Sequence, residues 1–484
     1  MIVNNRKIAR KGIINILLTF SSQFVSLILS LVMTIIIPKM LGVSEFGYWQ
    51  LYLFYTGYIG LFHFGLIDGI NLRNGGLSYH SLDKPVLKSQ LVVLIMVQML
   101  ISTIIITVGS ILVGNDNRLN ILLYTGICLV ITNTEMFFLY VLQATNKIKQ
   151  YAISVVVEKI VMLLLIVGLI YFQSNHFELY ILANIVSKVL GLLIGAYFCR
   201  DLIMGKMSDL KATIKELLEN VNSGSKLLLS NISSMLILGN GRFFIDKLWG
   251  IQVFGKVSFS FTLSNMILLF INSISIVLFP ILRRVPKEKL TEIYSVLRTG
   301  LMMLLTGALI IYIPAKEVVS IWLPNYAESL KYMALIFPLV IFDGKMQMLI
   351  STNFKVIRKE GMLLKVNVIS VIGSIILCGF SAYVVNSVNA VIVSMVIIVI
   401  FRSVIAEIYL SREINISITK NLIREILLVI IFMLSSWYID GIISMLIYAG
   451  AYLVFLYSNR KDVRKVLKVI KKVFSRESEG GKEE

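Results

Sequence analysis

The sequence predicts an all-α membrane protein of about fourteen transmembrane helices, and three observations lead to that fold class. Of the 484 residues, 57% are hydrophobic and only 15% are charged, whereas a soluble domain has about 25% charged residues. The apolar residues form runs of roughly 20, which is the length of a helix that crosses the hydrocarbon core of a bilayer. The connections between the runs are alternately rich and poor in lysine and arginine, as in multi-pass membrane proteins.

The expected spans are 13–37, 48–70, 91–114, 119–142, 153–172, 178–199, 226–249, 254–281, 299–321, 330–352, 364–385, 388–410, 425–439 and 441–457. The first run follows a basic N-terminus. It is longer than the apolar region of a signal peptide and lacks a small-x-small cleavage site, so we expect an uncleaved helix. The last two runs are short, and one re-entrant hairpin in their place would give about twelve spans.

Polar residues form one stripe along the first expected helix, at Asn15, Thr19, Ser22, Ser26 and Ser30. Small hydroxyl residues at this spacing fit either close packing of helices or the lining of a cavity, and both interpretations stay open.

The basic residues give the orientation in the membrane. The net charge of +19 does not indicate nucleic-acid binding, because the basic residues lie in short clusters between apolar runs. Most of the 46 lysines and arginines fall in the connections on one side, and the other side holds only Lys39, Arg118, Lys247, Lys256, Lys316 and Lys331. Lysine and arginine are enriched in cytoplasmic loops, so we expect both termini in the cytoplasm.

A short motif occurs twice and indicates an internal duplication. The hexapeptides Gly42 to Gly47 and Gly250 to Gly255 both fit G-[VI]-x-x-F-G, and they follow the first and the seventh expected helix. We therefore expect a six-helix lobe at 1–199, a cytoplasmic linker at 200–225, a second six-helix lobe at 226–410, an extra helix pair at 411–457 and a basic amphipathic tail at 458–484 that lies on anionic lipid headgroups.

This layout favours a transporter. Each lobe has an even number of helices, so both lobes start on the same side and the repeat is parallel. Parallel lobes place a substrate path between them, and rocking of the lobes gives alternating access.

Cations within the spans are the candidate substrate-binding residues. Lys188 lies near the middle of its span, one turn from Asn184, where a charge costs at least ~2.5 to 3.5 kcal/mol and usually faces a protein or water-filled interior. Arg242 and Lys345 are the other candidates, and Lys345, Lys159 and Arg402 lie near enough to the cytoplasmic ends to reach headgroups. Such cations suit an anionic substrate, although an ion pair that only fixes helix packing is the alternative for Lys188.

Acids within the spans are candidates for a coupling ion. We expect Asp246, Asp343 or Glu135 to bind a proton or a sodium ion. Arg242 and Asp246 are four residues apart and able to pair. A solvated interfacial position is expected for the remaining three acids, which are Asp68, Glu158 and Glu407.

Several kinds of chemistry are not indicated. The histidines His63, His80 and His176 stand alone at helical spacing, so we expect them to be structural. The sequence has no P-loop, no dinucleotide-binding turn and no spaced metal ligands, so no catalytic residue, cofactor, metal or ATP-driven pumping is expected.

Three segments carry a resemblance to a known family. They are Ile37-Pro38-Lys39-Met40-Leu41-Gly42 with Glu45-Phe46-Gly47-Tyr48-Trp49, then Ile245-Asp246-Lys247-Leu248-Trp249-Gly250 with Phe254-Gly255, and Leu278-Phe279-Pro280-Ile281-Leu282. In these the chain resembles the bacterial polysaccharide transporters, the flippases of lipid-linked oligosaccharides (O-antigen or capsule repeat units) within the MATE-like exporter superfamily. Only Asp246 and Lys247 fall on a recurrent family motif.

The resemblance implies a two-lobed helical fold with a central cationic cavity in the bacterial cytoplasmic membrane. It implies that the protein moves an undecaprenyl-diphosphate-linked oligosaccharide to the outer leaflet, with a polysaccharide polymerase and chain-length machinery as expected partners. One rival is a multidrug or cation exporter of the same superfamily, whose cavity we would expect to be acidic and aromatic. The other is a membrane polysaccharide polymerase, for which we would expect a large external loop with catalytic residues.

Overall fold

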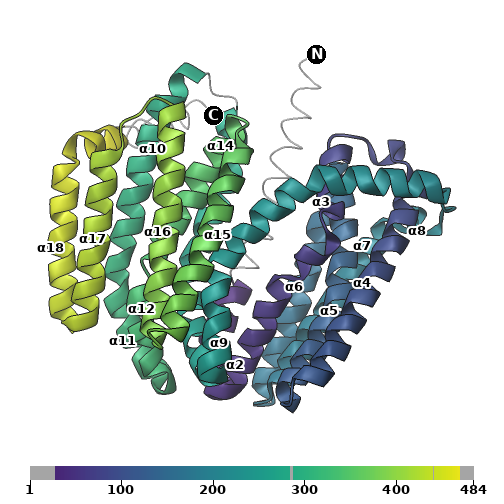
Figure 1. Cartoon of the computed structure of the whole chain (residues 1–484), viewed down its shortest axis with the longest axis horizontal. Coiled ribbons are helices and arrows are strands. Elements are labelled where there is room, and N and C mark those ends of the chain that lie inside the picture. The colour runs from purple at the N-terminus through teal and green to yellow at the C-terminus, as the bar shows by residue number, and fades with distance from the viewer. Residues whose placement is uncertain (1–27, 284–286, 440, 469–484) are drawn as a thin grey trace, which may run out of the picture. The chain divides into compact units, whose positions relative to one another are not determined.

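The computed structural model describes residues 28–283, 287–439 and 441–468, and nearly all of them are helical (Figure 1). Most of the expected first span, the stripe residues from Asn15 to Ser26 and the end of the C-terminal tail lie outside the described residues. The chain divides into two compact units. Unit 1 comprises Met1–Met235 and Gly250–Gly255, and unit 2 comprises Leu236–Trp249 and Lys256–Glu484. The expected lobe boundaries at 199 and 226 stay predictions.

Unit 1 is a bundle of helices with short connections. Its elements are α2 (Ile37–Gly57), η1 (Ile59–His63), α3 (Leu66–Asn74), η2 (Tyr79–Ser81), α4 (Lys84–Leu112), α5 (Asp116–Ala144), α6 (Ile148–Tyr171), α7 (Phe177–Phe198), α8 (Arg200–Met204) and the first part of α9 (Leu210–Arg283).

The described part of unit 2 contains one bent helix pair, Pro324–Ile336 with Leu339–Val356, and several long helices. After α9 its elements are α10 (Lys287–Ala308), η3 (Leu309–Ile311), α11 (Tyr312–Trp322), η4 (Pro324–Tyr326), α12 (Ala327–Ile336), α13 (Leu339–Lys345), the π-helical η5 (Met346–Ser351), α14 (Thr352–Val356), α15 (Glu360–Tyr383), α16 (Val388–Glu413), α17 (Thr419–Tyr438) and α18 (Gly441–Ser458).

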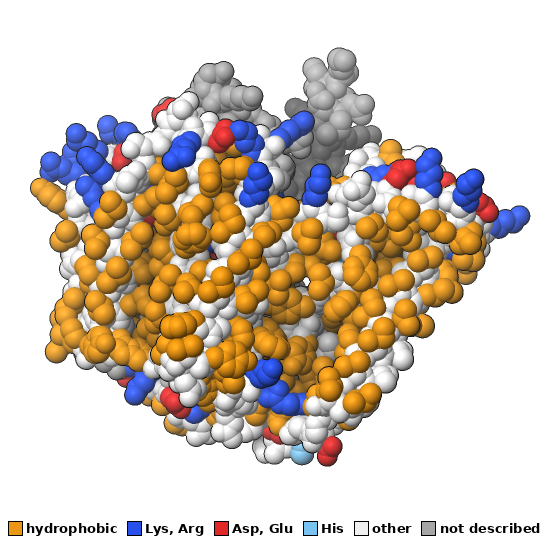
Figure 2. Space-filling view, in the orientation of Figure 1, with side chains coloured by type: hydrophobic (Ala, Val, Ile, Leu, Met, Phe, Trp, Pro, Cys, Tyr) orange, Lys and Arg blue, Asp and Glu red, His pale blue; other side chains and the backbone are white. Residues whose placement is uncertain are grey.

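The all-α fold class is confirmed, and the described helices are those of a multi-pass membrane protein. Within the described residues, nine helices are long and apolar enough to cross a membrane, or up to eleven if each of two bent pairs forms one span. The expected seventh and eighth spans lie within the single element α9, and α17 and α18 each qualify on their own. The total of fourteen stays a prediction. Figure 2 shows the matching surface, in which apolar side chains cover the middle of each unit and charged side chains gather at its ends.

The two hexapeptides form equivalent turns. Gly42 has φ 70° and ψ 177°, and Gly250 has φ 77° and ψ −177°. A positive φ of this kind is strained for any residue with a Cβ, so each motif needs its first glycine. The last glycines allow a close approach within unit 1, because a Cβ on Gly47 would lie 2.5 Å from the carbonyl oxygen of Ile251 and a Cβ on Gly255 would lie 2.9 Å from Gly47 Cα. The shared conformation is what a duplicated turn predicts.

The segment expected as a linker, 200–225, is mostly helical and packs against the other helices of unit 1. A Cβ on Gly69 of α3 would meet the backbone of Asn220 in α9, so the two helices touch backbone to backbone. Arg73 adds ion pairs with Glu216 at 2.8 Å and Glu219 at 2.7 Å.

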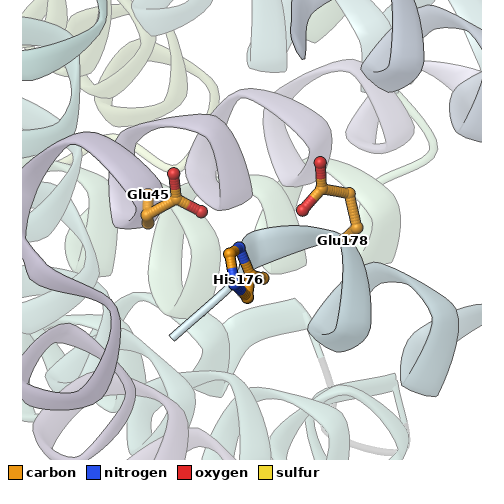
Figure 3. Close-up of side chains that lie close together, drawn as sticks. All are labelled: Glu45, His176 and Glu178. Carbon is orange, nitrogen blue, oxygen red and sulfur yellow. The ribbon is translucent and has the colours of Figure 1, made fainter. Parts of the chain in front are cut away.

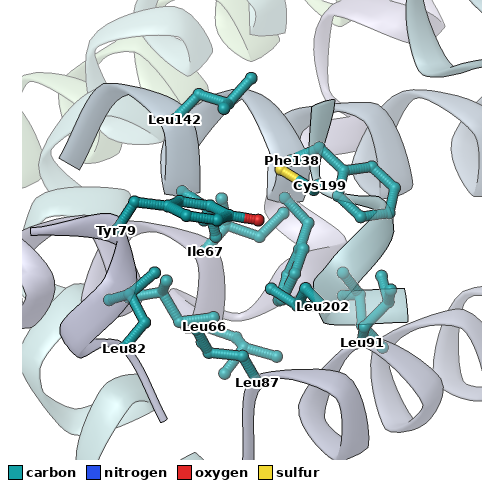
Figure 4. Packing of buried hydrophobic residues seen from close by; sticks show 14 residues of the cluster. Leu66, Ile67, Tyr79, Leu82, Leu87, Leu91, Phe138, Leu142, Cys199 and Leu202 are labelled. Carbon is teal, nitrogen blue, oxygen red and sulfur yellow. The ribbon is translucent and has the colours of Figure 1, made fainter. Parts of the chain in front are cut away.

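A hydrophobic cluster closes the end of unit 1 at which α8 begins (Figure 4). Leucine, isoleucine and phenylalanine side chains from α3, α4, α5 and α8 surround Tyr79, which is 4% exposed. The Tyr79 hydroxyl donates to Asp201 Oδ1 at 2.7 Å, and Lys84 Nζ donates to Oδ2 at 2.6 Å. Partial burial alone would raise the pKa of Asp201, but these hydrogen bonds outweigh it and lower the pKa from 3.8 to about 2.

Candidate functional site

A charged cluster lies inside unit 1, where α5, α6 and α7 pack together. Lys188 is at the middle of α7, and its Nζ lies 3.6 Å from Oε1 of Glu158 on α6. The same oxygen is 3.2 Å from Nζ of Lys159. The Lys188 side chain is 19% exposed, whereas that of Glu158 is 8% exposed. The cation therefore has a partner and keeps part of its surface accessible.

Asn184 lies one turn before Lys188 and ties this cluster to α2. The Tyr52 hydroxyl donates to Asn184 Oδ1 at 3.0 Å, and Tyr52 is fully buried. This hydrogen bond uses the amide oxygen of Asn184 and not its NH2 group, because a side-chain amide has separate donor and acceptor ends. Asn184 and Lys188 thus lie one turn apart on α7, and their role in substrate binding stays a prediction.

Glu135 of α5 completes the cluster and is only 3% exposed. Gly191 makes room for it, because a Cβ there would meet Glu135 Oε1 and would lie 3.2 Å from Glu158 Cβ. Among the described residues, Glu135 Oε1 is a buried oxygen with no hydrogen-bond partner. A buried carboxylate oxygen without a partner is costly, and it calls for a proton or a cation.

The other candidates lie in unit 2. Arg242 is half-buried in α9, where its Nη2 donates to Ser258 Oγ at 3.0 Å and its guanidinium lies 5.8 Å from the ring centre of Phe261. Asp246, one turn further along α9, is 5% exposed.

Lys345 lies in a buried network of four charges that we call the unit 2 quartet, made of Lys345, Arg298, Glu407 and Glu425. Lys345 Nζ is 2.7 Å from Glu407 and 3.0 Å from Glu425, and its side chain is 0% exposed. Arg298 contacts the same two acids at 2.6 and 2.7 Å. Two cations thus balance two carboxylates, and Lys345 presents no accessible charge to a substrate in this conformation.

Asp343 is also neutralised. Its Oδ1 lies 3.4 Å from Nη1 of Arg402, whose Nε donates to Asn367 Oδ1 at 2.8 Å. Neither member of the pair is on the surface, since Asp343 is 8% and Arg402 is 6% exposed. The expectation that Lys345 and Arg402 reach lipid headgroups is therefore wrong, because both point into the protein toward acids.

The expectation that three acids are solvated is also wrong. Asp68, Glu158 and Glu407 are all 6% exposed or less. Sequence reasoning also missed Arg298 and Glu425. It placed Arg298 just before the expected span 299–321, and it placed Glu425 at the first residue of the expected span 425–439. The signal was present, since both begin apolar runs, but charges at the end of a run are normally assigned to water.

Two histidines have acidic neighbours that helical spacing in the sequence did not identify, and their structural role stays a prediction. His63 Nε2 lies 3.8 Å from Asp68 Oδ2. His176 lies beside Glu45 and Glu178 at one end of unit 1 (Figure 3).

Comparisons with known proteins agree with this architecture. The family described as "Polysaccharide biosynthesis protein" matches residues 13–286. An inward-facing multidrug resistance MATE family transporter of the MOP superfamily is 14% identical with a TM-score of 0.59, and the match covers 81% of this chain and 98% of the transporter. The lipid II flippase MurJ in an inward closed conformation is 14% identical with a TM-score of 0.55, covering 93% and 99%.

A MOP superfamily transporter from Pyrococcus furiosus is 12% identical with a TM-score of 0.54, covering 83% of this chain and 95% of its own. None of the curated proteins compared with the chain matches it in sequence. At these identities the likenesses show the fold, which is that of the MATE-like transporters.

Proposed function

The chain belongs to the polysaccharide biosynthesis protein family, and from that premise we propose that it is a flippase for an undecaprenyl-diphosphate-linked oligosaccharide. It carries this repeat unit across the bacterial cytoplasmic membrane for a surface polysaccharide such as O-antigen or capsule. Lipid II flippase MurJ, which shares the fold, is a flippase by name. A polymerase and chain-length machinery would receive the product outside.

The observation that carries the proposal is the position of Lys188. A cation at the middle of a transmembrane helix is tolerated only with a partner or in a polar interior, and Lys188 has both Glu158 and a partly accessible surface. A diphosphate offers several anionic oxygens, so it can bind an ammonium group that already has one carboxylate contact. Asn184, on the same face of α7, supplies an amide for hydrogen bonds to phosphate or sugar hydroxyls.

Arg242 is the second cation in the proposal. It is half-buried and donates to a hydroxyl through Nη2, and a guanidinium binds phosphate well because its N–H groups form a planar fork. Lys345, by contrast, is bound to two carboxylates at 0% exposure, so we assign it a structural role.

Glu135 is the acid that we propose for coupling. Of the three candidates, Asp343 pairs with Arg402, and Asp246 has no orphan oxygen in the described part of the chain. Glu135 has a buried oxygen without a hydrogen-bond donor, next to the proposed substrate site. A proton or a sodium ion on Glu135 removes that cost and links ion movement to the rocking of the two lobes.

Complementation tests the proposal. In a flippase-deficient host we expect Lys188→Arg to restore most surface polysaccharide and Lys188→Met to restore little, because Met has a similar volume and no charge. Lys149→Met, which removes an exposed lysine of α6, is the matched control and should behave as wild type. Membrane protein level is measured beside polysaccharide.

Full restoration by a normally accumulating Lys188→Met would contradict the role of Lys188. A wild-type protein that restores no polysaccharide but lowers susceptibility to cationic drugs would favour the exporter of the same fold.

A further inference from the structure

Three potential metal ligands meet at one end of unit 1, away from the Lys188 cluster. Glu45 lies in the first hexapeptide turn on α2, His176 immediately precedes α7, and Glu178 is in the first turn of α7. One ligand atom from each residue lies within 4.8 Å of the other two. Figure 3 shows the imidazole of His176 between the carboxylates of Glu45 and Glu178.

The fold holds the first of these ligands in place. Gly42 turns the chain just before Glu45, and Glu45 Oε2 accepts a hydrogen bond from the backbone N–H of Phe177 at 2.9 Å. The neighbouring rings of Tyr48 and Phe177 pack 5.1 Å apart, so α2 and α7 are fixed against each other at this point. The capping bond uses one carboxylate oxygen and leaves Oε1 for another partner.

The charge of the group is unbalanced. Among the described residues, neither Glu45 nor Glu178 forms an ion pair with a lysine or an arginine. Two carboxylates at this separation repel each other unless a cation lies between them. His176 is exposed and the two glutamates are half-buried, so an ion can enter from solvent.

We propose that Glu45, His176 and Glu178 form a site for a divalent transition metal, with zinc as the ion that fits best. Imidazole nitrogen and carboxylate oxygen are both zinc ligands, and water would complete the coordination. Zinc ligands lie about 2.0 Å from the metal, hence about 3.3 Å from one another. Rotation of the exposed His176 and of the half-buried Glu178 side chain would bring the three ligand atoms that close. Calcium and magnesium prefer oxygen ligands alone, so the imidazole selects against them.

The site belongs to the first repeat only. In the second hexapeptide the position of Glu45 is occupied by Val253, which cannot bind a metal. The metal therefore joins α2 to α7 within unit 1, and its expected effect is greater thermal stability of the chain, whatever the transported substrate.

The test uses the purified full-length protein in detergent. Zinc affinity is measured by competition with a fluorescent chelator, cobalt is added to read the absorption of its bound form, and the melting temperature is recorded with and without zinc. We expect one tight zinc site per chain, little response to calcium or magnesium, and a higher melting temperature with zinc.

His176→Gln is the main variant, and His80→Gln, which changes another exposed histidine of unit 1, is its matched control. Partners outside the first coordination shell already contribute ~10 to 100-fold in affinity, so loss of a ligand should weaken zinc binding by at least about 100-fold. Glu178→Gln should do the same, and it decides the matter if His176→Gln fails to fold. Zinc affinity in His176→Gln or Glu178→Gln close to that of wild type, or wild type without a saturable site, overturns the proposal.

Discussion

Replacing Lys345 with Met tests whether the unit 2 quartet is structural. Each of its two contacts, at 2.7 and 3.0 Å, has a Coulomb energy of about 6 kcal/mol at an effective dielectric constant of about 20. Much of that is offset by the desolvation of the ammonium group, which costs several kcal/mol. The substitution leaves Glu407 and Glu425 buried with Arg298 alone. Removing one partner of a buried ion pair typically costs about 3–5 kcal/mol, and we expect a loss of that size.

Adding a second substitution tests whether the loss of stability in Lys345→Met comes from the unbalanced charge or from the changed side-chain shape. Lys345→Met with Glu425→Gln leaves one cation, Arg298, with one carboxylate, Glu407, and should recover most of the lost stability. The melting temperature in detergent and the amount of protein in the membrane are measured for Lys345→Met, for Glu425→Gln and for the double variant. Matched losses in the single variants and recovery in the double variant indicate coupling.

Two outcomes refute this reasoning. Lys345→Met with an unchanged melting temperature shows that the quartet does not stabilise the fold. A stable Lys345→Met protein that loses transport returns Lys345 to the substrate site, where the sequence first placed it.

Two further predictions concern the ends of unit 1. The lysine and arginine pattern puts 200–225 inside the cell and 173–177 outside. In a background without the three native cysteines, Ala212→Cys in α9 should therefore resist an impermeant thiol reagent added to intact cells, and Asn175→Cys should react with it. The reverse labelling pattern would invert the topology. Since the folded pKa of Asp201, about 2, is below its ordinary value of 3.8, its bonds stabilise the fold above about pH 4 and lose this effect as the pH falls toward 2. Thermal denaturation should therefore show Lys84→Met less stable than wild type at pH 6, with the difference shrinking below pH 4, and a constant difference would contradict it.

The sequence predicts where helices lie better than it predicts what they touch. Apolar runs of roughly 20 residues identify helices such as α4, α6 and α15, because burial in lipid leaves few other structures for such a run. The hexapeptides that begin at Gly42 and Gly250 are found because the motif repeats, and in the structure both glycines have the positive φ that a residue with a Cβ rarely adopts. Apolar runs and repeated motifs thus predict features that depend on residues close together in the chain.

Ion pairs across helices are not local, and here sequence reasoning fails. Lys188 and Glu158 are 30 positions apart on α7 and α6, and their contact depends on how each helix is rotated about its axis. Lys345, Glu407 and Glu425 come from three helices, and taken alone Lys345 looks like a costly charge available to a substrate. The proximity of Glu45 and His176 could not be predicted from the sequence either, because 131 positions separate the two residues in the chain.

The last prediction concerns Glu135, and it follows from the contrast between the two charged clusters. The unit 2 quartet has two cations and two acids in contact, so it has no spare charge for a ligand. In unit 1, Glu135 Oε1 lacks a donor and both Glu135 and Glu158 pack at Gly191, one turn from Lys188. A proton on Glu135 removes a negative charge beside Lys188 and so favours a bound diphosphate.

By linkage, a bound diphosphate must favour the proton to the same extent. Glu135→Gln imitates the protonated acid. We therefore expect this variant to bind undecaprenyl diphosphate in detergent at least as tightly as wild type, with an affinity that no longer changes with pH, while transport in vesicles no longer responds to an imposed proton gradient. Asp343→Asn, which alters a paired acid, serves as the comparison and should keep the pH dependence. A Glu135→Gln protein that keeps both the pH-dependent affinity and the response to the gradient would place the coupling group elsewhere in the chain.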